Sequence, residues 1–226
     1  MADNIAAKVI SILGGTGKEG KGLAYQWTKA GHTVIIGSRS QEKALAAADE
    51  VNQKLAPFTD LRVTGLENDA AAEKCDIAVL TVPFSAHVPM LESLRGKLEG
   101  KILIDVTVPI VPPKVTKVQL PVAGSAALET RAILGEGVQI ASAFQNISYD
   151  NLWNDRDTEC EVLVTGTGKE TRAVVLELVK DAGLIGWDAG PLENSLVAEA
   201  LTSILIGINR QYGVEGSGIR ITGVHR

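Results

Sequence analysis

Short apolar runs alternate along the chain with segments in which apolar residues recur at helical spacing. The continuous runs predict strands that are buried on both faces, at residues 9–13, 33–36, 61–64, 77–82, 102–108 and 138–144. The spaced segments predict helices at residues 23–30, 44–55, 69–74, 85–98 and 126–134. Alternation of this kind requires parallel strands joined by right-handed crossovers. The pattern therefore predicts an α/β fold, a Rossmann-type doubly wound parallel sheet.

The pattern changes after residue 150. One more strand is expected at residues 161–166, followed by helices at 169–182 and 191–212. The apolar stripe of the last helix is wide enough to pack on a partner subunit as well as on its own core. We therefore expect a Rossmann domain at residues 1–150 and a small, mainly helical C-terminal region at residues 151–226. Residues 110–122 contain three of the eight prolines and are expected to leave the regular scheme.

Composition excludes several functional classes. The chain has 226 residues, 45% of them hydrophobic, and a net charge of -5. This balance is that of a globular protein, and it argues against nucleic acid or an anionic membrane as the main partner. Cys75 and Cys160 lie too far apart in sequence to indicate a disulfide framework or a metal site. The cytoplasm is the default location.

A glycine-rich loop carries the most specific chemistry. The segment Gly15-Thr16-Gly17-Lys18-Glu19-Gly20 follows the first predicted strand and opens a helix, which is the context of a dinucleotide-binding loop. Gly15 should permit the tight turn, Gly17 the approach of a pyrophosphate, and Gly20 the close packing of helix and strand. The helix N-terminus would then direct its free N–H groups at the phosphates. A plain strand-to-helix turn is the alternative.

The end of the second strand indicates which dinucleotide is preferred. An NAD site has an acidic residue there, but this chain has Ser38 and Arg39, with Lys43 one helical turn later. These groups suit the 2′-phosphate of NADP, and the hydroxyl of Thr16 is a further candidate. The alternative is that Arg39 and Lys43 are solvated surface charges.

No familiar catalytic set is evident in the sequence. The Tyr25 and Lys29 pair matches a Tyr-x-x-x-Lys motif, but it lies in the first helix and is interpreted as a chance match on the helix surface. His32 is expected to be structural and His225 to lie at a frayed end, while His87 lies near the expected cofactor site with its role open. No catalytic side chain and no metal ligand is predicted. This suits hydride transfer between two cofactors, where orientation supplies most of the catalysis.

These motifs, together with the segments CDIAVLTVPF, ILIDVTVPI, ASAFQNIS, DAGPLENS and GIRIT, resemble the NADPH-dependent reductases of coenzyme F420, a 5-deazaflavin. The resemblance covers nearly the whole chain. It implies hydride transfer between NADP(H) and F420 as co-substrate, in a homodimer with small-molecule partners only.

The resemblance also implies residue roles. Thr16, Gly17, Lys18 and Glu19 would line the pyrophosphate loop, and Ser38, Arg39 and Lys43 the 2′-phosphate. Phe84 and Val88 would contact the nicotinamide half, Ile147 and Tyr149 would lie in the segment closing over it, and Ser217 would contact the deazaflavin. An NADPH-dependent flavin or ferric-chelate reductase and a non-catalytic NADP(H) sensor remain alternatives. The physiological direction of transfer is left open by the sequence.

Overall fold

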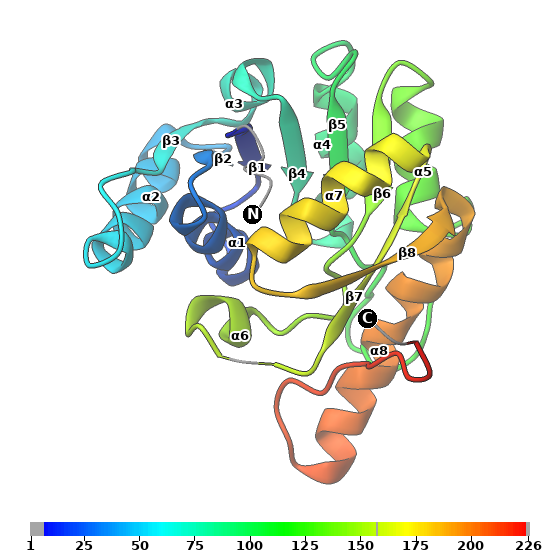
Figure 1. Cartoon of the computed structure of the whole chain (residues 1–226). Coiled ribbons are helices and arrows are strands. Elements are labelled where there is room, and N and C mark those ends of the chain that lie inside the picture. Colours follow the sequence, from blue (N-terminus) through cyan, green and yellow to red (C-terminus); the bar gives the residue numbers. More distant parts are fainter. Residues whose placement is uncertain (1–6, 157, 225–226) are drawn as a thin grey trace.

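The computed structural model describes residues 7–156 and 158–224, which form a layered α/β fold around one sheet (Figure 1). The strand order is β3-β2-β1-β4-β5-β6-β7-β8. Strands β1 to β6 are parallel, which confirms the predicted doubly wound sheet, but β7 pairs antiparallel with β6 and β8 parallel with β7. The strands are β1 Val9–Leu13, β2 Thr33–Ser38, β3 Thr64–Glu67, β4 Ile77–Leu80, β5 Ile102–Asp105, β6 Gln139–Ser142, β7 Glu161–Gly166 and β8 Ile185–Pro191.

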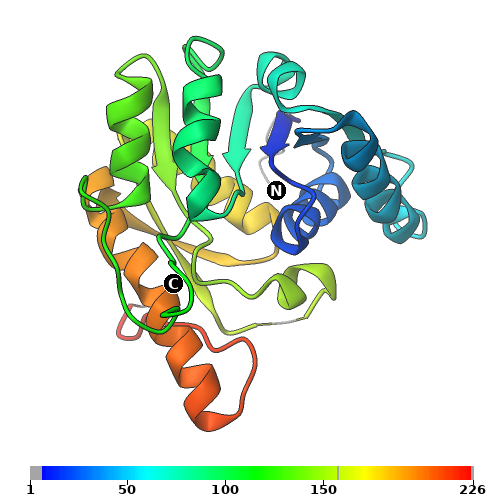
Figure 2. The ribbon, with the colours of Figure 1, turned by 180° about the vertical axis from the view of Figure 1, so that it is seen from behind.

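Helices cover both faces of the sheet (Figures 1 and 2). One core cluster contains buried residues of α1, α2, α6 and α7, and a second contains residues of α3, α4 and α5. The bounds are α1 Lys18–Lys29, α2 Gln41–Leu55, α3 Asn68–Lys74, α4 His87–Ser93, α5 Ala126–Leu134, α6 Tyr149–Trp153, α7 Lys169–Asp181 and α8 Ser195–Tyr212, with 3-10 turns at Phe84–Ala86 and Leu192–Asn194.

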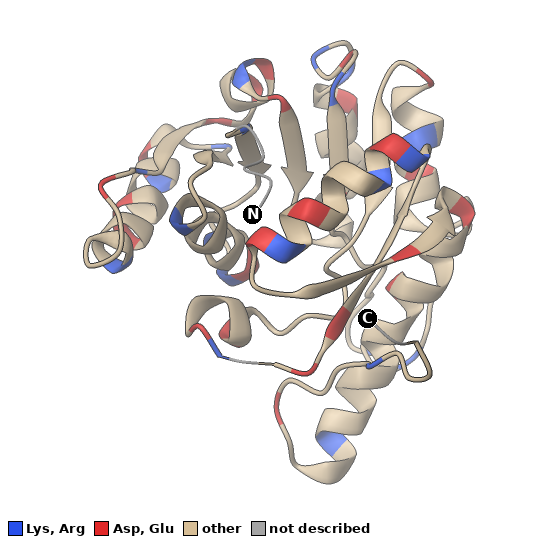
Figure 3. Ribbon diagram, in the orientation of Figure 1, with Lys and Arg blue, Asp and Glu red and all other residues tan. Residues whose placement is uncertain are grey.

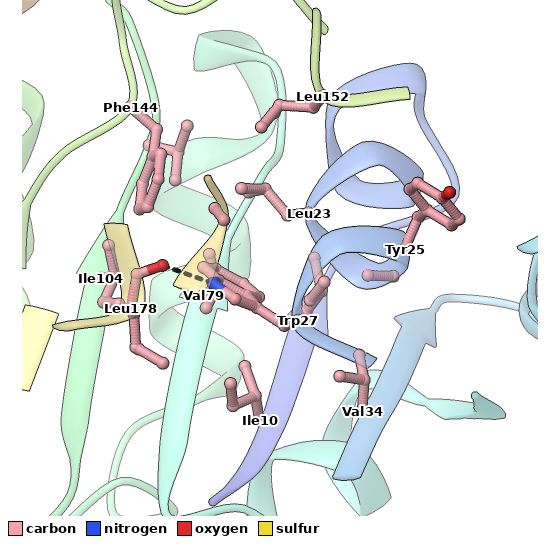
Figure 4. Close-up of a cluster of buried hydrophobic side chains, with 14 of the residues drawn as sticks. Ile10, Leu23, Tyr25, Trp27, Val34, Val79, Ile104, Phe144, Leu152 and Leu178 are labelled. Atoms are coloured by element: carbon pink, nitrogen blue, oxygen red, sulfur yellow. Dashed lines mark hydrogen bonds between the residues drawn. The ribbon is translucent and has the colours of Figure 1, made fainter. Parts of the chain in front are cut away.

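Trp27 of α1 lies at the centre of the larger cluster (Figure 4). Its ring meets that of Phe144 edge to face, with 5.7 Å between the ring centroids. Its Nε1–H donates a hydrogen bond of 2.8 Å to the carbonyl oxygen of Leu178 in α7. The buried indole therefore has a polar partner, as buried tryptophan usually requires. The same hydrogen bond joins α1 to α7.

Several expected bounds were wrong. The third strand begins at Thr64, because the Asn52 side chain of α2 takes both main-chain bonds of Val63, at 2.8 and 2.9 Å. The helix expected at residues 85–98 is a 3-10 turn followed by the shorter α4. Strand β8 was missed because its sequence, IGWDAGP, is poor in β-formers. The five-residue helix α6 is too short to show periodicity.

The C-terminal residues stay tied to the sheet. Strands β7 and β8 extend the sheet begun by β1 to β6, and α8 begins near the end of β8 and projects beyond the sheet (Figure 1). The tail then returns to β7, where the Glu161 amide donates to the Ile219 carbonyl oxygen at 2.8 Å. The division at residue 150 thus falls within one continuous sheet and stays a prediction. Among the helices of the described residues, none combines the length and apolarity needed to cross a membrane.

Candidate dinucleotide-binding site

The glycine loop joins the carboxyl end of β1 to the first turn of α1. A Cβ on Gly15 would lie 2.6 Å from the Ile12 carbonyl oxygen, and one on Gly20 would lie 2.6 Å from the Gly15 Cα. Larger residues at either position would push the helix away from the strand. A Cβ on Gly17, by contrast, would meet no atom within 4 Å. The loop is therefore tight where it packs on the protein and open at Gly17, the helix N-cap, where an anion can approach free N–H groups.

The left-handed backbone of this turn lies at Gly14, the residue before Gly15. Gly14 has φ +70°, and a Cβ there would lie 2.4 Å from Val82 Cγ1. Its N–H donates a 3.1 Å hydrogen bond to Oδ1 of the buried Asn68, the first residue of α3. Asn68 thus joins the loop to the β3–α3 connection. The sequence reasoning missed it, because no motif links two residues 54 positions apart.

The residues predicted for a 2′-phosphate lie together at the carboxyl end of β2. Ser38 ends this strand, Arg39 follows it, and Lys43 is in the first turn of α2. The Ser38 Oγ accepts a hydrogen bond from the Ser40 amide at 3.3 Å, and the Ser40 hydroxyl caps α2. Arg39 and Lys43 are exposed, and neither side chain has an ion pair or hydrogen bond to another described residue. Two cationic groups are therefore available to an anion beside a helix N-terminus.

A segment after β6 closes over the glycine loop, and we call residues 147–156 the strap. In the strap, Tyr149 lies over Lys18, whose Nζ donates a 2.7 Å hydrogen bond to the Tyr149 hydroxyl and lies 4.5 Å from its ring centroid. This contact raises the pKa of Lys18, chiefly through the hydrogen bond. Ile147 is buried at the beginning of the strap. The structure thus brings Tyr149 to the first residue of α1, beside the glycine loop.

The strap is fastened to α1 through Asp155. Its carboxylate accepts hydrogen bonds from the Tyr25 hydroxyl at 2.6 Å, the Gln26 amide at 2.9 Å and the Lys29 ammonium at 2.9 Å. The Tyr-x-x-x-Lys match therefore serves packing. Tyr25 is fully buried, so its expected place on the helix surface was wrong. Its pKa rises, because burial and the neighbouring carboxylate both disfavour the phenolate.

Ser217 lies in the C-terminal tail against α8. Its hydroxyl donates to the Leu205 carbonyl oxygen at 3.2 Å, and its amide donates to Asn209 Oδ1 at 3.0 Å. A Cβ on the preceding Gly216 would lie 3.3 Å from Ser148 Cβ. The tail and the strap are therefore neighbours, although the expected contacts of Ser217 and Ile147 with cofactors stay predictions.

Phe84 and Val88 follow β4, the strand beside β1 where the strand order reverses. In open α/β sheets this reversal is where ligands bind. Val88 is 40% exposed. The Phe84 ring stacks on the imidazole of His87, with 5.8 Å between the ring centroids and 28° between the planes. His87 itself is fully buried, so it is not available to touch a bound ligand directly.

His87 belongs to a buried polar cluster that the sequence reasoning missed. Its Nδ1 is 2.8 Å from Glu129 Oε2, and its Nε2 is 2.9 Å from Asp105 Oδ2. Thr130 Oγ1 donates to the same Asp105 oxygen at 2.6 Å. Nearby, Glu199 of α8 accepts the first two N–H groups of α5, and burial raises its pKa to about 8. These groups come from four elements, so no local motif announces them.

Glu19 also has an unusual environment. Its Oε1 is shielded from solvent and has no hydrogen-bond partner in the part of the chain that the structure describes, and burial raises the pKa of the carboxyl to about 8. At neutral pH the side chain is therefore mostly protonated. An uncharged Glu19 does not repel a phosphate bound at the adjacent helix N-terminus, so its place in the loop is compatible with the predicted pyrophosphate site.

The remaining histidines and the cysteines have structural surroundings. His32 is buried, with Nε2 2.9 Å from Asp181 and Nδ1 accepting the Lys8 amide at 3.2 Å, in agreement with its structural interpretation. His225 lies outside the described residues. Cys75 and Cys160 are free and buried, and burial raises the pKa of both thiols. Within the described part of the chain, no group of three or more His, Cys, Asp or Glu side chains is arranged so that it could hold a metal ion.

The chain is similar to proteins described as F420-dependent NADP reductases. A family model described as "NADP oxidoreductase coenzyme F420-dependent" matches residues 9–109. The F420-dependent NADP reductase of Methanocaldococcus jannaschii is 37% identical over 219 residues, which cover 94% of this chain and 97% of the relative. That of Methanothermobacter marburgensis is 38% identical with the same coverage. A solved structure from Arthrobacter sp. FB24, 22% identical, has a TM-score of 0.81 and covers 96% of this chain and 100% of its own, so it is similar in fold.

Proposed function

Because the chain belongs to the family of F420-dependent NADP oxidoreductases, we propose that it is an oxidoreductase that transfers a hydride between NADP(H) and the deazaflavin coenzyme F420. The observation that carries this proposal is the dinucleotide site itself. It combines an open glycine loop at a helix N-terminus with two cations, at the end of the next strand, that pair with no other residue of 7–156 and 158–224.

The residues present fit NADP(H). The space around Gly17 admits a pyrophosphate to the N-terminus of α1. Arg39 and Lys43 have no side-chain partner among the described residues, so they can bind a 2′-phosphate without breaking a hydrogen bond or ion pair to any of them. Ser38 and Thr16 would supply further hydroxyl groups. An acidic residue at this place would select NAD instead, and this chain has none there.

The transfer step needs orientation more than acid–base chemistry. When bound, NADPH supplies the hydride and the deazaflavin accepts it. In this proposal Phe84 and Val88 would contact the nicotinamide half at the carboxyl end of β4, and Ile147 and the strap would close over it. Ser217 and the adjoining tail would contact the deazaflavin. Holding two reactants in a reactive geometry supplies much of the rate in such reactions.

We infer a two-part organisation, with residues 1–150 binding NADP(H) and residues 151–226 contributing the deazaflavin pocket and subunit contacts.

A homodimer is supported by α8, which carries few charges (Figure 3). Val197, Ile204, Ile208 and Tyr212 are 37–69% exposed and follow one side of this helix. In the proline-containing segment 110–122, the side chains of Val111, Leu120 and Val122 are also exposed. Apolar surface of this kind is typical of a subunit interface. We place the enzyme in the cytoplasm, where buried free thiols are common.

An anaerobic assay with purified protein tests the function. The oxidised deazaflavin should lose its visible absorbance in the presence of NADPH and far more slowly with NADH. No loss of absorbance would refute the proposal. Equal rates with FMN or a ferric chelate would favour a flavin or ferric reductase. Equal affinity for NADPH and NADP⁺ with no turnover of any acceptor would favour a sensor.

Light scattering tests the dimer. It should give twice the chain mass, and a monomer would refute the dimer.

A further inference from the structure

The imidazole of His87 is held at both nitrogens by carboxylates. Asp105, at the end of β5, faces Nε2 at 2.9 Å, and Glu129, in α5, faces Nδ1 at 2.8 Å. The ring is fully buried, whereas the Glu129 side chain is 23% exposed. A neutral imidazole carries only one N–H and can donate to only one of these two acceptors. The arrangement is satisfied when the ring carries both protons.

Asp105 is held in its ionised form. Besides His87, its carboxylate accepts hydrogen bonds from the Thr107 amide at 2.9 Å and the Thr130 hydroxyl at 2.6 Å. Burial by itself would raise the pKa of Asp105, but these donors and the charge of His87 outweigh it, so the pKa is lowered. Burial likewise disfavours a charged His87, yet Asp105 and Glu129 outweigh that cost and its pKa is raised. The ionised form of each partner supports that of the other.

One further ionisable group faces the cluster. Glu199 of α8 is 1% exposed and interacts with the charges of both Asp105 and His87. Its oxygens accept the Ala126 and Ala127 amides, which orients it toward α5. Of the described residues, His87 is thus surrounded by Asp105, Glu129, Thr130 and, further out, Glu199.

The imidazole is also the support for Phe84. The two rings stack, and Phe84 belongs to the connection after β4 whose Val82 side chain packs against Gly14 of the glycine loop. Displacement of the imidazole would therefore move the phenyl ring relative to the dinucleotide loop. We propose that His87, held as an imidazolium between Asp105 and Glu129, is a positioning residue that fixes Phe84 against the nicotinamide for hydride transfer. This inference rests on the proposed function.

The test removes one of the two carboxylates that contact His87 and keeps the imidazole ring. Glu129→Gln leaves the imidazole in place but takes away one carboxylate. Glu136→Gln, the same chemical change at an exposed residue after α5, is the matched control. For each chain, kcat, the NADPH dissociation constant and the thermal midpoint are measured across a pH series with deazaflavin as acceptor. Phe84→Leu tests the supported ring directly.

We expect kcat of Glu129→Gln to fall about tenfold at pH 8, since misplacement of a reacting group by about 1 Å can cost a hundredfold. The NADPH dissociation constant should change less than about threefold, because the phosphate contacts that dominate affinity lie elsewhere. The pH at which activity declines on the alkaline side should move to lower values, because His87 loses its proton more readily without Glu129. Phe84→Leu should lower kcat with no shift in that pH. A lower thermal midpoint with an unaltered pH profile would assign Glu129 and His87 to stability only and overturn the inference.

Nitrogen-15 NMR of the histidine rings provides a readout that does not depend on turnover. Only three histidines are present, and His87→Gln assigns the His87 signals. Both His87 nitrogens should show the imidazolium shift at pH 7.5, and a neutral tautomer there would overturn the inference. If the unmodified chain reduces no deazaflavin, the proposed function fails, and the role in hydride transfer fails with it. A neutral ring in an active chain refutes only the role of His87.

Discussion

Replacing Arg39 with alanine removes the guanidinium that follows β2 while leaving the protein interior unchanged. The side chain is exposed and has no ion pair or hydrogen bond to another described residue. Its loss therefore leaves no buried group without a partner, and the free energy of unfolding should change by less than about 0.5 kcal/mol. Any large change in affinity then reports on the ligand.

The size of the effect follows from the contacts that Arg39 can make. A hydrogen bond between charged groups contributes about 1.5–3 kcal/mol, which corresponds to a loss of about 10- to 150-fold in NADPH affinity. NADH lacks the 2′-phosphate and retains only stacking of the guanidinium on the adenine. Such stacking contributes about 0.5–1 kcal/mol at an exposed site, or about two- to fivefold. Arg39→Ala should therefore weaken NADPH binding at least about twofold more than NADH binding, and up to about 75-fold more.

Quenching or enhancement of nicotinamide fluorescence gives both dissociation constants at constant ionic strength. Arg62→Ala is the matched control, because Arg62 is exposed and, within the described chain, its side chain bonds only to main-chain oxygens of its own loop, at residues 59 and 61. It makes the same change in net charge away from the carboxyl ends of the strands. An equal loss of NADPH and NADH affinity in Arg39→Ala would refute the 2′-phosphate role. A matching loss in Arg62→Ala would show that net charge alone is responsible.

Three further predictions follow from the loop and the strap. The added methyl group of Gly17→Ala meets no neighbouring atom, so this variant should keep its thermal midpoint but bind NADPH more weakly. That of Gly20→Ala overlaps the loop backbone, so both the thermal midpoint and the affinity for NADPH should fall. A lower thermal midpoint in Gly17→Ala would contradict the open-loop geometry. Burial raises the pKa of Glu19 from 4.5 to about 8, so this carboxyl favours folding below about pH 4.5 and its contribution is lost as pH rises toward 8, with a slope of at most about 1.4 kcal/mol per pH unit. Glu19→Gln should therefore gain stability over wild type as pH rises across this window in urea denaturation, and a difference independent of pH would contradict the burial. Asp155→Asn keeps a residue type that tolerates the positive φ at this position, but it removes the charge that three α1 side chains bind. The free energy of unfolding should therefore fall by about 1 kcal/mol, and proteolysis of the strap should become faster. Unchanged proteolysis would show that Asp155 does not hold the strap on α1.

The dinucleotide loop and the first strands were predictable because their signals are local. Strands buried on both faces read as continuous apolar runs, and the spacing of Gly15, Gly17 and Gly20 reflects contacts within one strand–turn–helix unit. The position of Arg39 follows in turn from the end of β2. The contacts of Gly14 with Val82 and Asn68, by contrast, join the loop to distant segments and were not predicted.

Contacts between distant segments were decided by packing alone. Strand β8 has a sequence of low β propensity and is a strand because β7 offers it an edge. Tyr149 meets Lys18 across 131 positions, and His87 meets Asp105 and Glu129 from three different elements. No periodicity or motif encodes such pairs, since residue type fixes only what a side chain can bind. Which groups lose their water, and hence which carboxyls and imidazoles change their proton affinity, depends on the assembled layers of sheet and helix.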